Sequence, residues 1–438
     1  MFAYYLRLAL TSLRRSPGVT ILLVVAIGLG IGASMTLVTV LHVMSGDPVP
    51  SLSAHLYAPH LDPRPVAKVG KEEDGPSDDF TYVDAMALLH AKRAERQAVM
   101  AGGQVLLRSA PDEPNFKPSY VTTRFVTADF FPMFEVPLRA GRALDEDDVT
   151  NRSRVVVVDE VLGRRLFGSD EPLGKKLRLG EGTFTIVGIT AAWHPEPLFY
   201  DDSSGRTMFG KPDMMFVPLT TSIDLGMEAN NLDCWGDTPD TGNNHLSGEC
   251  SWLQVWVQLG DDKSVASYSG YLRDYERAQK ERGRFERSGS TRLYRLDQWL
   301  DHAHIVPGDL RLQLWLALGF LAVCVLNIVA LLMAKFLRRG GEISIRRALG
   351  ARRLDIFAQC AAEAFAIGIG GGLLGLVLTM VGLWTVRQRP DDYAHLAHLD
   401  LTMLLATLGF AVGSAVLACL LPAWRACLVP PALQLKSE

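Results

Sequence analysis

Four long apolar stretches stand out along the chain, at residues 19–44, 312–337, 356–386 and 399–421. Each is at least as long as the roughly 20 apolar residues with which a helix crosses a bilayer core of about 30 Å. The alternative for each stretch is a helix buried in a globular core. Runs beyond about 18 residues with so few charges are, however, typical of membrane spans. We therefore predict four transmembrane helices.

Basic residues gather beside these stretches in three places. Residues 1–18, the link 338–355 and the tail 422–438 all carry more Lys and Arg than Asp and Glu. Short basic flanks stay on the cytoplasmic side, and four spans bring all three flanks to one side of the membrane. The pattern predicts cytoplasmic termini, a large outer segment at residues 47–311 and a short outer loop at 387–398.

The outer segment has the local patterns of a mixed α and β domain. Helical spacing predicts a helix over residues 80–97, with Asp78 or Asp79 as its N-cap. A short apolar strand is predicted at residues 155–158, and Asp159 then caps a second helix.

Glycines and alternation predict the elements that follow. The second helix ends at Gly168. Residues 175–179 and 183–189 form a hairpin around a turn at 180–182, because glycines there can adopt positive φ. Residues 252–259 alternate between aliphatic residues and Trp or Gln, which predicts a half-buried strand.

Two cysteines are placed differently from the other four. Those four lie in predicted spans or in the tail, where cysteine acts as a small apolar side chain. Cys234 and Cys250 lie in the outer segment and flank a polar loop. In an oxidising compartment this arrangement predicts a disulfide, and two free thiols are the alternative.

Charge and motifs exclude several classes of function. The net charge of −4 lacks the basic excess of a nucleic-acid-binding protein, so we predict no nucleic-acid partner. The chain has no G-x4-G-K-[ST], H-E-x-x-H, C-x-x-C or G-x-S-x-G motif. We therefore predict no catalytic residues, no metal site and no cofactor in this chain.

Small residues recur at helical spacing in the predicted spans. Glycines four residues apart let helix backbones approach each other closely, although membrane helices also tolerate glycine without such contact. The glycines predicted to pack against other helices are Gly28, Gly32, Gly368, Gly372, Gly409 and Gly413.

One acid, Glu363, lies inside the third apolar stretch, about two turns from its basic end. An ionisable residue within a membrane span indicates function by default. The alternative is a carboxylate that reaches the membrane surface or pairs with a neighbouring arginine. The residues leave both readings open.

The link 338–355 is the most distinctive segment of the chain. It holds six arginines, and helical spacing gives it one charged and one apolar face that end at Gly350. Such a helix lies on anionic lipid or docks in a groove of a cytoplasmic partner. Residue types alone do not choose between these two readings.

Within this link, residues 341–356 (GEISIRRALGARRLDI) resemble the signature of the MacB/FtsX-type ABC permeases. In that family the segment is the coupling helix, which docks on the ATP-binding subunit. The resemblance covers nearly the whole chain, because further segments match the family in the same order. These segments are residues 4–18, 130–142, 155–159, 165–167, 172–175, 184–188 and 421–426.

The resemblance implies a membrane protein with four transmembrane α-helices and a large α+β extracytoplasmic domain inserted between helices 1 and 2. Residues 1–18 would form an amphipathic cytoplasmic helix ahead of the first span. Because the chain starts at that helix, we expect a separate ATPase subunit to bind ATP and Mg²⁺. The residues expected to couple to that ATPase are Glu342, Ile343, Arg346, Arg347, Leu349, Gly350 and Arg353.

The function implied is that of the permease in a mechanotransmission-type ABC exporter of the bacterial inner membrane. ATP hydrolysis by the ATPase subunit would move the periplasmic domain and drive efflux of an antibiotic, a peptide or another small molecule. The other expected partners are a second permease, identical or different, together with a periplasmic adaptor and an outer-membrane duct. Two alternatives are an FtsX-like signal transmitter that activates a periplasmic cell-wall hydrolase, and a membrane-anchored sensor.

Overall fold

The computed structural model divides into two compact units. The sheet domain is Gly46–Ile305, and the helical unit combines Met1–Ser45 with Val306–Glu438. The residues that the structure describes are 17–66, 78–109, 117–168, 171–201, 208–236, 246–305, 308–338, 345, 349–350, 352–388 and 401–428.

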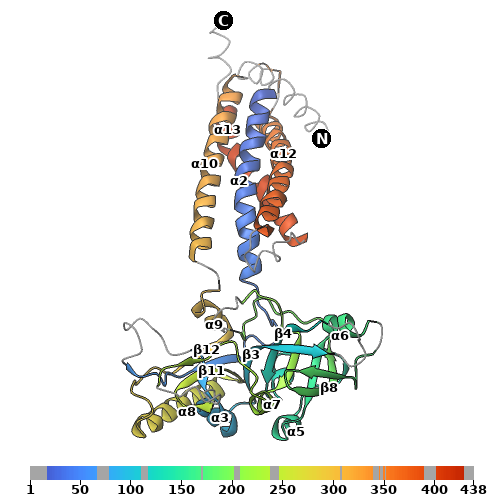
Figure 1. The fold of residues 1–438 in the computed structure, drawn as a ribbon. Helices are drawn as coiled ribbons and strands as arrows, with labels where there is room; N and C mark the ends of the chain where they lie inside the picture. Colours follow the sequence, from blue (N-terminus) through green and yellow to red (C-terminus); the bar gives the residue numbers. More distant parts are fainter. Residues whose placement is uncertain are drawn as a thin grey trace. The chain divides into compact units, whose positions relative to one another are not determined.

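Four long helices make up the described part of the helical unit, and each is labelled in Figure 1. They are α2 (Pro17–Met44), α10 (Gly308–Arg338), α12 (Arg353–Arg387) and α13 (Leu401–Leu428). The first three contain stretches long and apolar enough to cross a membrane. The described part of α13 contributes a shorter apolar helix, Met403–Ala418.

Several helix ends differ from the predicted ends of the apolar stretches, because hydropathy identifies the apolar part of a helix and not the residue at which its backbone hydrogen bonding ends. The largest difference is at α13. The predicted stretch ends at residue 421, whereas the helix runs on through Pro422 to Leu428.

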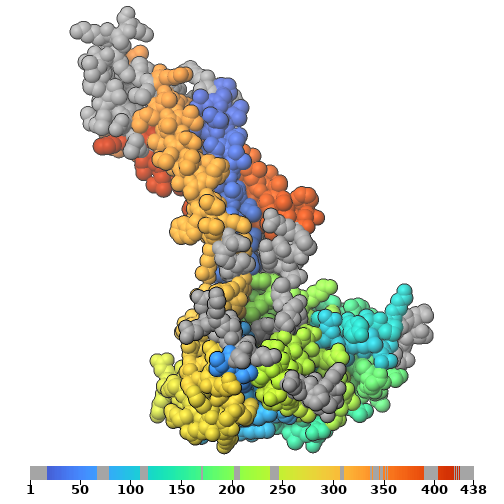
Figure 2. All heavy atoms as spheres, turned by 60° about the vertical axis from the view of Figure 1, so that its left-hand side comes forward, coloured from blue at the N-terminus to red at the C-terminus, as the bar shows by residue number. Residues whose placement is uncertain are grey.

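Apolar side chains fill the inside of the helix bundle and also cover its outside. Ile27, Leu332, Ala364 and Ala411, one from each helix, are buried in one cluster. In this cluster α2 and α13 each pack against both α10 and α12. Exposed apolar side chains, Trp315 among them, lie on α10. Figure 2 shows this helix in orange at the surface of the helical unit. Helices that are apolar all round are typical of membrane spans.

The sheet domain is built on a mixed sheet. Its strands are β1 (Leu56–His60), β2 (Phe80–Thr81), β3 (Arg96–Ser109), β4 (Ser119–Val126), β5 (Leu138–Gly141), β6 (Val155–Asp159), β7 (Lys176–Leu179), β8 (Gly182–Thr190), β9 (Met215–Pro218), β10 (Asp233–Cys234), β11 (Cys250–Gln258) and β12 (Arg292–Arg295). The main path follows the order β12-β1-β11-β3-β4-β9-β6-β8-β5. The pairs β4 with β9 and β6 with β8 are parallel, and the other described pairs are antiparallel.

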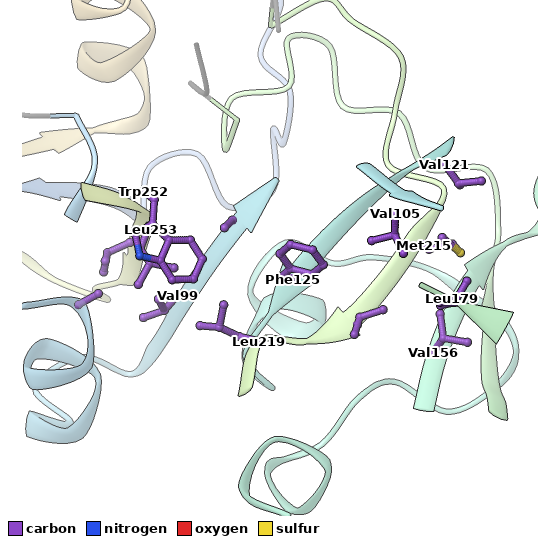
Figure 3. Close-up of a cluster of buried hydrophobic side chains, with 14 of the residues drawn as sticks. Val99, Val105, Val121, Phe125, Val156, Leu179, Met215, Leu219, Trp252 and Leu253 are labelled. Atoms are coloured by element: carbon purple, nitrogen blue, oxygen red, sulfur yellow. The ribbon is translucent and has the colours of Figure 1, made fainter. Parts of the chain in front are cut away.

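Seven helices of the sheet domain are described: α3 (Tyr82–Ala91), α4 (Phe130–Met133), α5 (Glu146–Thr150), α6 (Glu160–Phe167), α7 (Leu219–Asp224), α8 (Asp262–Glu281) and α9 (Leu296–His302). α3 packs against β3 and β11, and α9 packs against β1 and β12. The apolar side chains form two buried clusters. The larger one includes Phe125 and Leu253 (Figure 3), and the other includes Phe130 and Trp256.

Strand β11 is buried on both faces, so the prediction of a half-buried strand at 252–259 is wrong. Leu253 and Val255 face the larger cluster, whereas Trp256 on the opposite face belongs to the other. Gln254 is buried as well and donates a hydrogen bond to Asp79. Alternation of residue types detected the strand, but it could not show that the Trp and Gln face would also be covered.

The helix predicted over residues 80–97 is shorter in the structure. Residues 80 and 81 form β2, α3 ends at Ala91, and β3 begins at Arg96. The N-cap is Thr81, whose side chain accepts a hydrogen bond from the backbone N–H of Asp84, in place of Asp78 or Asp79. The chain turns after α3 because Lys92 adopts a left-handed conformation.

The elements with strong local signals are confirmed. Strand β6 leads into α6, which Asp159 caps at its start and Gly168 ends. Strands β7 and β8 form the predicted hairpin. Its turn has two residues, Gly180 and Glu181, because Leu179 already pairs with Gly182.

Candidate functional site

The candidate site is the link that connects α10 to α12. In its described part, the backbone N–H of Leu349 donates a 3.0 Å hydrogen bond to the carbonyl of Ile345, which closes one helical turn. Gly350 follows with φ of +101°, a conformation that favours glycine and ends the turn. The backbone N–H of Arg352 then donates to Asp355 at 3.0 Å and caps the start of α12.

Three apolar side chains of this link are exposed. Leu349 is 84% exposed, Leu354 is 76% exposed and Ile345 is 54% exposed. Ile345 and Leu349 are four residues apart, so they lie on the same side of a helical turn. Leu349 was predicted as a contact residue, whereas Ile345 and Leu354 were not, although this spacing could have indicated Ile345. Exposed apolar side chains of this kind offer a contact surface to a partner or to lipid.

The other predicted coupling residues are not placed by the structure. Glu342, Ile343, Arg346 and Arg347 lie outside the described residues. Arg353 is the first residue of α12, and its side chain is also outside the described part. Their roles therefore stay predictions.

Four of the six predicted packing glycines lie at close helix contacts. A Cβ at Gly28 would be 2.8 Å from the side chain of Leu374, and one at Gly32 would be 2.6 Å from the Cβ of Leu378. These two glycines therefore let α2 approach α12. Gly368 and Gly372 do the same between α12 and α13, where a Cβ would be 2.9 Å from Ala415 and Ala411, respectively.

Gly409 and Gly413 differ from this prediction. Among the residues that the structure describes, nothing lies within 4 Å of a Cβ built at either position. The reason is the helical period, because α13 contacts α12 through Ala411 and Ala415, two residues further along. Two residues correspond to a rotation of about 200° around an α-helix, which places the two glycines on the opposite side.

Glu363 is paired inside the helix bundle. Its Oε2 lies 3.0 Å from Nζ of Lys335 on α10, and the two side chains are almost fully buried. The partner is thus a lysine from another helix, whereas the sequence suggested a neighbouring arginine. Among the buried side chains described in the four helices, only these two are charged.

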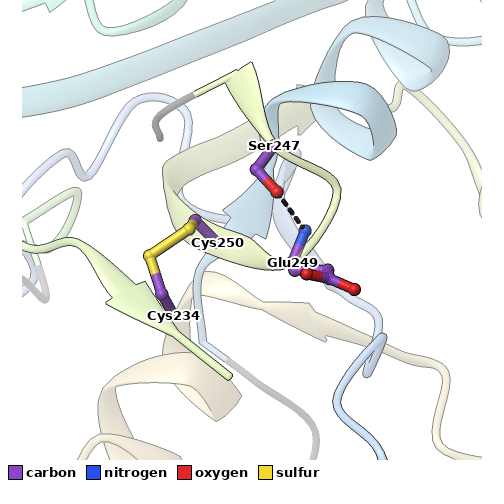
Figure 4. The surroundings of a disulfide bond; sticks show 4 residues. All are labelled: Cys234, Ser247, Glu249 and Cys250. Atoms are coloured by element: carbon purple, nitrogen blue, oxygen red, sulfur yellow. Dashed lines mark hydrogen bonds between the residues drawn. A yellow bond between two sulfur atoms is a disulfide. The ribbon is translucent and has the colours of Figure 1, made fainter. Parts of the chain in front are cut away.

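In the sheet domain, Cys234 and Cys250 form a disulfide (Figure 4). They are opposite each other on the antiparallel strands β10 and β11. Near this bond the backbone N–H of Glu249 donates a 3.1 Å hydrogen bond to Oγ of Ser247. The bond holds β10 on the edge of β11.

A buried ionic cluster joins β4 to the segment before β9. Nε of Arg124 lies 2.9 Å from Oδ2 of Asp213, a second ion pair links Arg124 to Asp201, and the guanidinium lies over the ring of Tyr200. Burial by itself lowers the pKa of the Arg124 guanidinium. The two carboxylates outweigh burial and raise that pKa above its ordinary value. Sequence reasoning missed this cluster because its members are far apart along the chain.

Another buried acid of the sheet domain, Asp79, precedes β2. Burial raises the pKa of the Asp79 carboxyl to about 6, and hydrogen bonds donated by Gln254 and Asn231 only partly oppose that effect. No three His, Cys, Asp or Glu side chains gather into a metal site among the residues described.

Two known families match successive parts of the chain. Residues 20–275 match the MacB-like periplasmic core domain, and residues 315–431 match the FtsX-like permease C-terminal region. The chain therefore belongs to the MacB/FtsX-type permeases, with an α+β periplasmic core domain and apolar helices long enough to span a membrane.

The individual relatives share only about a quarter of their aligned residues with this chain. The macrolide export ATP-binding/permease protein MacB 1/2 of Paracoccus denitrificans (strain Pd 1222) is 26% identical over 408 residues, which are 92% of this chain and 54% of that protein. MacB of Neisseria meningitidis (strain Z2491) is 24% identical over 295 residues, 66% of this chain and 40% of that protein. The chain thus spans about half the length, or less, of these curated relatives.

Among solved structures, the periplasmic region of MacB from Actinobacillus actinomycetemcomitans aligns with a TM-score of 0.38 and 14% identity, covering 59% of this chain and 97% of that one. The extracellular domain of the noncanonic ABC-type transporter YknZ from Gram-positive bacteria aligns with a TM-score of 0.35 and 14% identity, covering 55% of this chain and 99% of that one.

Proposed function

We propose that this chain is the permease of a mechanotransmission-type ABC exporter. In this proposal α2, α10, α12 and α13 all cross the bacterial inner membrane. Both termini and the link 338–355 lie in the cytoplasm, and the sheet domain lies in the periplasm. An ATPase partner binds ATP and Mg²⁺ and moves the link. The movement reaches the sheet domain through α2 and α10, the helices that the chain connects directly to it.

The observation that carries the proposal is the combination of a MacB-like periplasmic core domain and an FtsX-like permease region in one chain. Relatives that match most of this chain are named export ATP-binding/permease proteins. The words "export" and "ATP-binding" in these names support a proposal of outward transport that requires ATP. They also make a macrolide the first substrate to test.

Two features of the helical unit support the same proposal. The exposed Leu349 and Leu354 give an ATPase an apolar surface on which to dock. Lys335 and Glu363 are the only charged side chains buried in the described part of α2, α10, α12 and α13, and they neutralise each other, so these four helices offer no charged path for a substrate. Export that starts in the periplasm needs no such path. We propose that a second permease, a periplasmic adaptor and an outer-membrane duct complete the assembly.

The test is ATP-dependent export. The chain is expressed together with the ATPase that co-purifies with it, in a strain without other efflux pumps, and accumulation of a radiolabelled macrolide is measured. We expect lower accumulation only when both proteins are present and the ATPase can hydrolyse ATP. Equal accumulation with an active and an inactive ATPase, for macrolides and for a panel of peptides, would contradict export.

A second function is favoured by one observation, the FtsX-like match at residues 315–431. A signal transmitter of that type would activate a periplasmic cell-wall hydrolase and export nothing. The same cells distinguish the two functions, because release of cell-wall fragments can be measured in parallel. ATPase-dependent fragment release without any change in accumulation would replace the exporter by the transmitter.

A further inference from the structure

The ion pair between Lys335 and Glu363 is costly for a membrane helix bundle. The side chain of Lys335 is 5% exposed and that of Glu363 is 1% exposed, with 3.0 Å between Nζ and Oε2. Lys335 is only three residues from the end of α10, where a lysine side chain could reach the membrane surface. It points into the bundle instead. A well-packed apolar pair is often at least as stable as a buried ion pair. Stability alone therefore does not account for the two charges.

The location of the pair indicates another role. α2 and α13 each pack against both α10 and α12, and Lys335 and Glu363 bridge α10 and α12 directly. These two helices are also the ones that the link joins. Lys335 is three residues before the end of α10 and Glu363 is ten residues after the start of α12. Along the helix axes these separations correspond to about 4.5 Å and about 15 Å.

The geometry points to a positioning role: Lys335 and Glu363 hold α10 and α12 together behind the coupling link, so that a displacement of the link moves both helices as one body. This inference rests on the proposed function of the link. α10 begins at Gly308, three residues after the last residue of the sheet domain, Ile305. A displacement of α10 therefore continues along the chain into the sheet domain. If α10 and α12 could instead bend apart, the displacement of the link would be lost between them and would not reach the sheet domain.

The test compares three chains: the wild type, an apolar variant and a charge-swapped variant. The apolar variant is Lys335→Met with Glu363→Met, which keeps side-chain length and removes both charges, so the bundle should still fold. The charge-swapped variant is Lys335→Glu with Glu363→Lys, which restores an ion pair of opposite direction. A role that is merely structural predicts that the apolar variant behaves as the wild type.

The first measurement requires no ATPase. Spin labels are attached at the exposed positions Ala334→Cys on α10 and Ile369→Cys on α12, in a chain whose other free cysteines are replaced by alanine. Pulsed electron spin resonance then gives the distribution of distances between the two helices. We expect a narrow distribution in the wild type, a clearly broader one in the apolar variant and recovery in the charge-swapped variant. Equal widths in the wild type and the apolar variant would overturn the inference.

The second measurement separates this inference from the proposed function. In the apolar variant we expect the ATPase to bind within about twofold of the wild-type affinity, because the link surface is unchanged, while ATP-dependent macrolide export falls about tenfold or more. Full export by the apolar variant would overturn the positioning role. A wild-type chain that exports nothing and binds no ATPase would contradict the proposed function. In that case the distance measurement still decides whether the pair holds the two helices together.

Discussion

Replacement of Arg124 by methionine should destabilise the sheet domain by about 3–5 kcal/mol, because it leaves buried carboxylates without their cation. The Arg124 and Asp213 side chains are fully buried, and that of Asp201 is 1% exposed. Methionine fills a similar volume, so the loss comes mainly from the two carboxylates, which no longer have the Arg124 cation beside them. For a domain of this size that loss corresponds to a fall of roughly 10 °C in unfolding temperature.

The assay is thermal unfolding of the purified full-length chain in detergent, followed by tryptophan fluorescence. Arg152→Met is the matched control, because Arg152 forms an ion pair with Asp224 at 2.8 Å but both side chains are exposed. An exposed pair contributes about 0–1 kcal/mol, so this variant should unfold close to the wild type.

The pH dependence identifies the cause of the loss. Acid protonates carboxylates that have lost their cation, so the difference between Arg124→Met and the wild type should shrink as the pH falls from 7 toward about 4. Adding Asp213→Asn to Arg124→Met should recover part of the stability at pH 7. Should Arg124→Met unfold within about 2 °C of the wild type, or lose equal stability at both pH values, the electrostatic reasoning is wrong.

Three further predictions concern separate features of the chain. The raised pKa of Asp79 means that the folded state holds its proton more tightly than the unfolded state, so its stabilising contribution is complete below about pH 4 and is lost as the pH rises through about 6. Asp79→Asn should therefore raise stability at pH 7 by at most about 3 kcal/mol and have little effect at pH 4, which unfolding at the two pH values measures. Cysteines introduced at exposed positions of the sheet domain should react with an impermeant reagent added to intact cells, and cysteines in residues 338–355 should not; labelling of that link from outside would refute the proposed topology. Mass spectrometry without reduction should recover Cys234 and Cys250 in one linked peptide pair, and two freely alkylated thiols would reject the bond.

Local signals in the sequence predicted several elements well. Three of the helices could be located because an apolar stretch long enough to cross a bilayer has few other interpretations. Strand β6 and helix α6 were predicted because the residues at the two ends of the helix are typical of such positions. The Asp159 side chain accepts a backbone hydrogen bond at the start of α6, and Gly168 adopts a positive φ at its end. In each case the residues that determine the element lie within it or beside it.

Features that depend on residues far apart in the sequence could not be predicted from local patterns. Arg124 pairs with carboxylates at positions 201 and 213, and no local pattern joins these positions. The burial of both faces of β11 likewise depends on which elements cover the sheet. Gly409 and Gly413 have the same spacing as the glycines that do pack, and only the orientation of α13 distinguishes them.

The identity of the partner of Glu363 shows the same limit. The sequence showed that Glu363 is an unusual acid inside an apolar stretch, and the structure indeed places it in a buried ion pair. The nearest basic residues along the chain are arginines of the link, whereas the structure brings in Lys335 from another helix. Spacing along one helix cannot show which residue of a neighbouring helix comes into contact.

The central claim is that the link docks on an ATPase, and binding of the ATPase to variants of the exposed apolar surface tests it most directly. Leu349→Asp places a charge in that surface, Leu349→Met keeps it apolar, and Glu342→Lys reverses the charge predicted to set orientation. We expect Leu349→Met to bind as the wild type, and the other two variants to insert normally but bind the co-purifying ATPase about tenfold more weakly or worse. If Leu349→Asp and Glu342→Lys both retain full ATPase binding and stimulation, the link does not couple to an ATPase, and a role at the lipid surface is preferred.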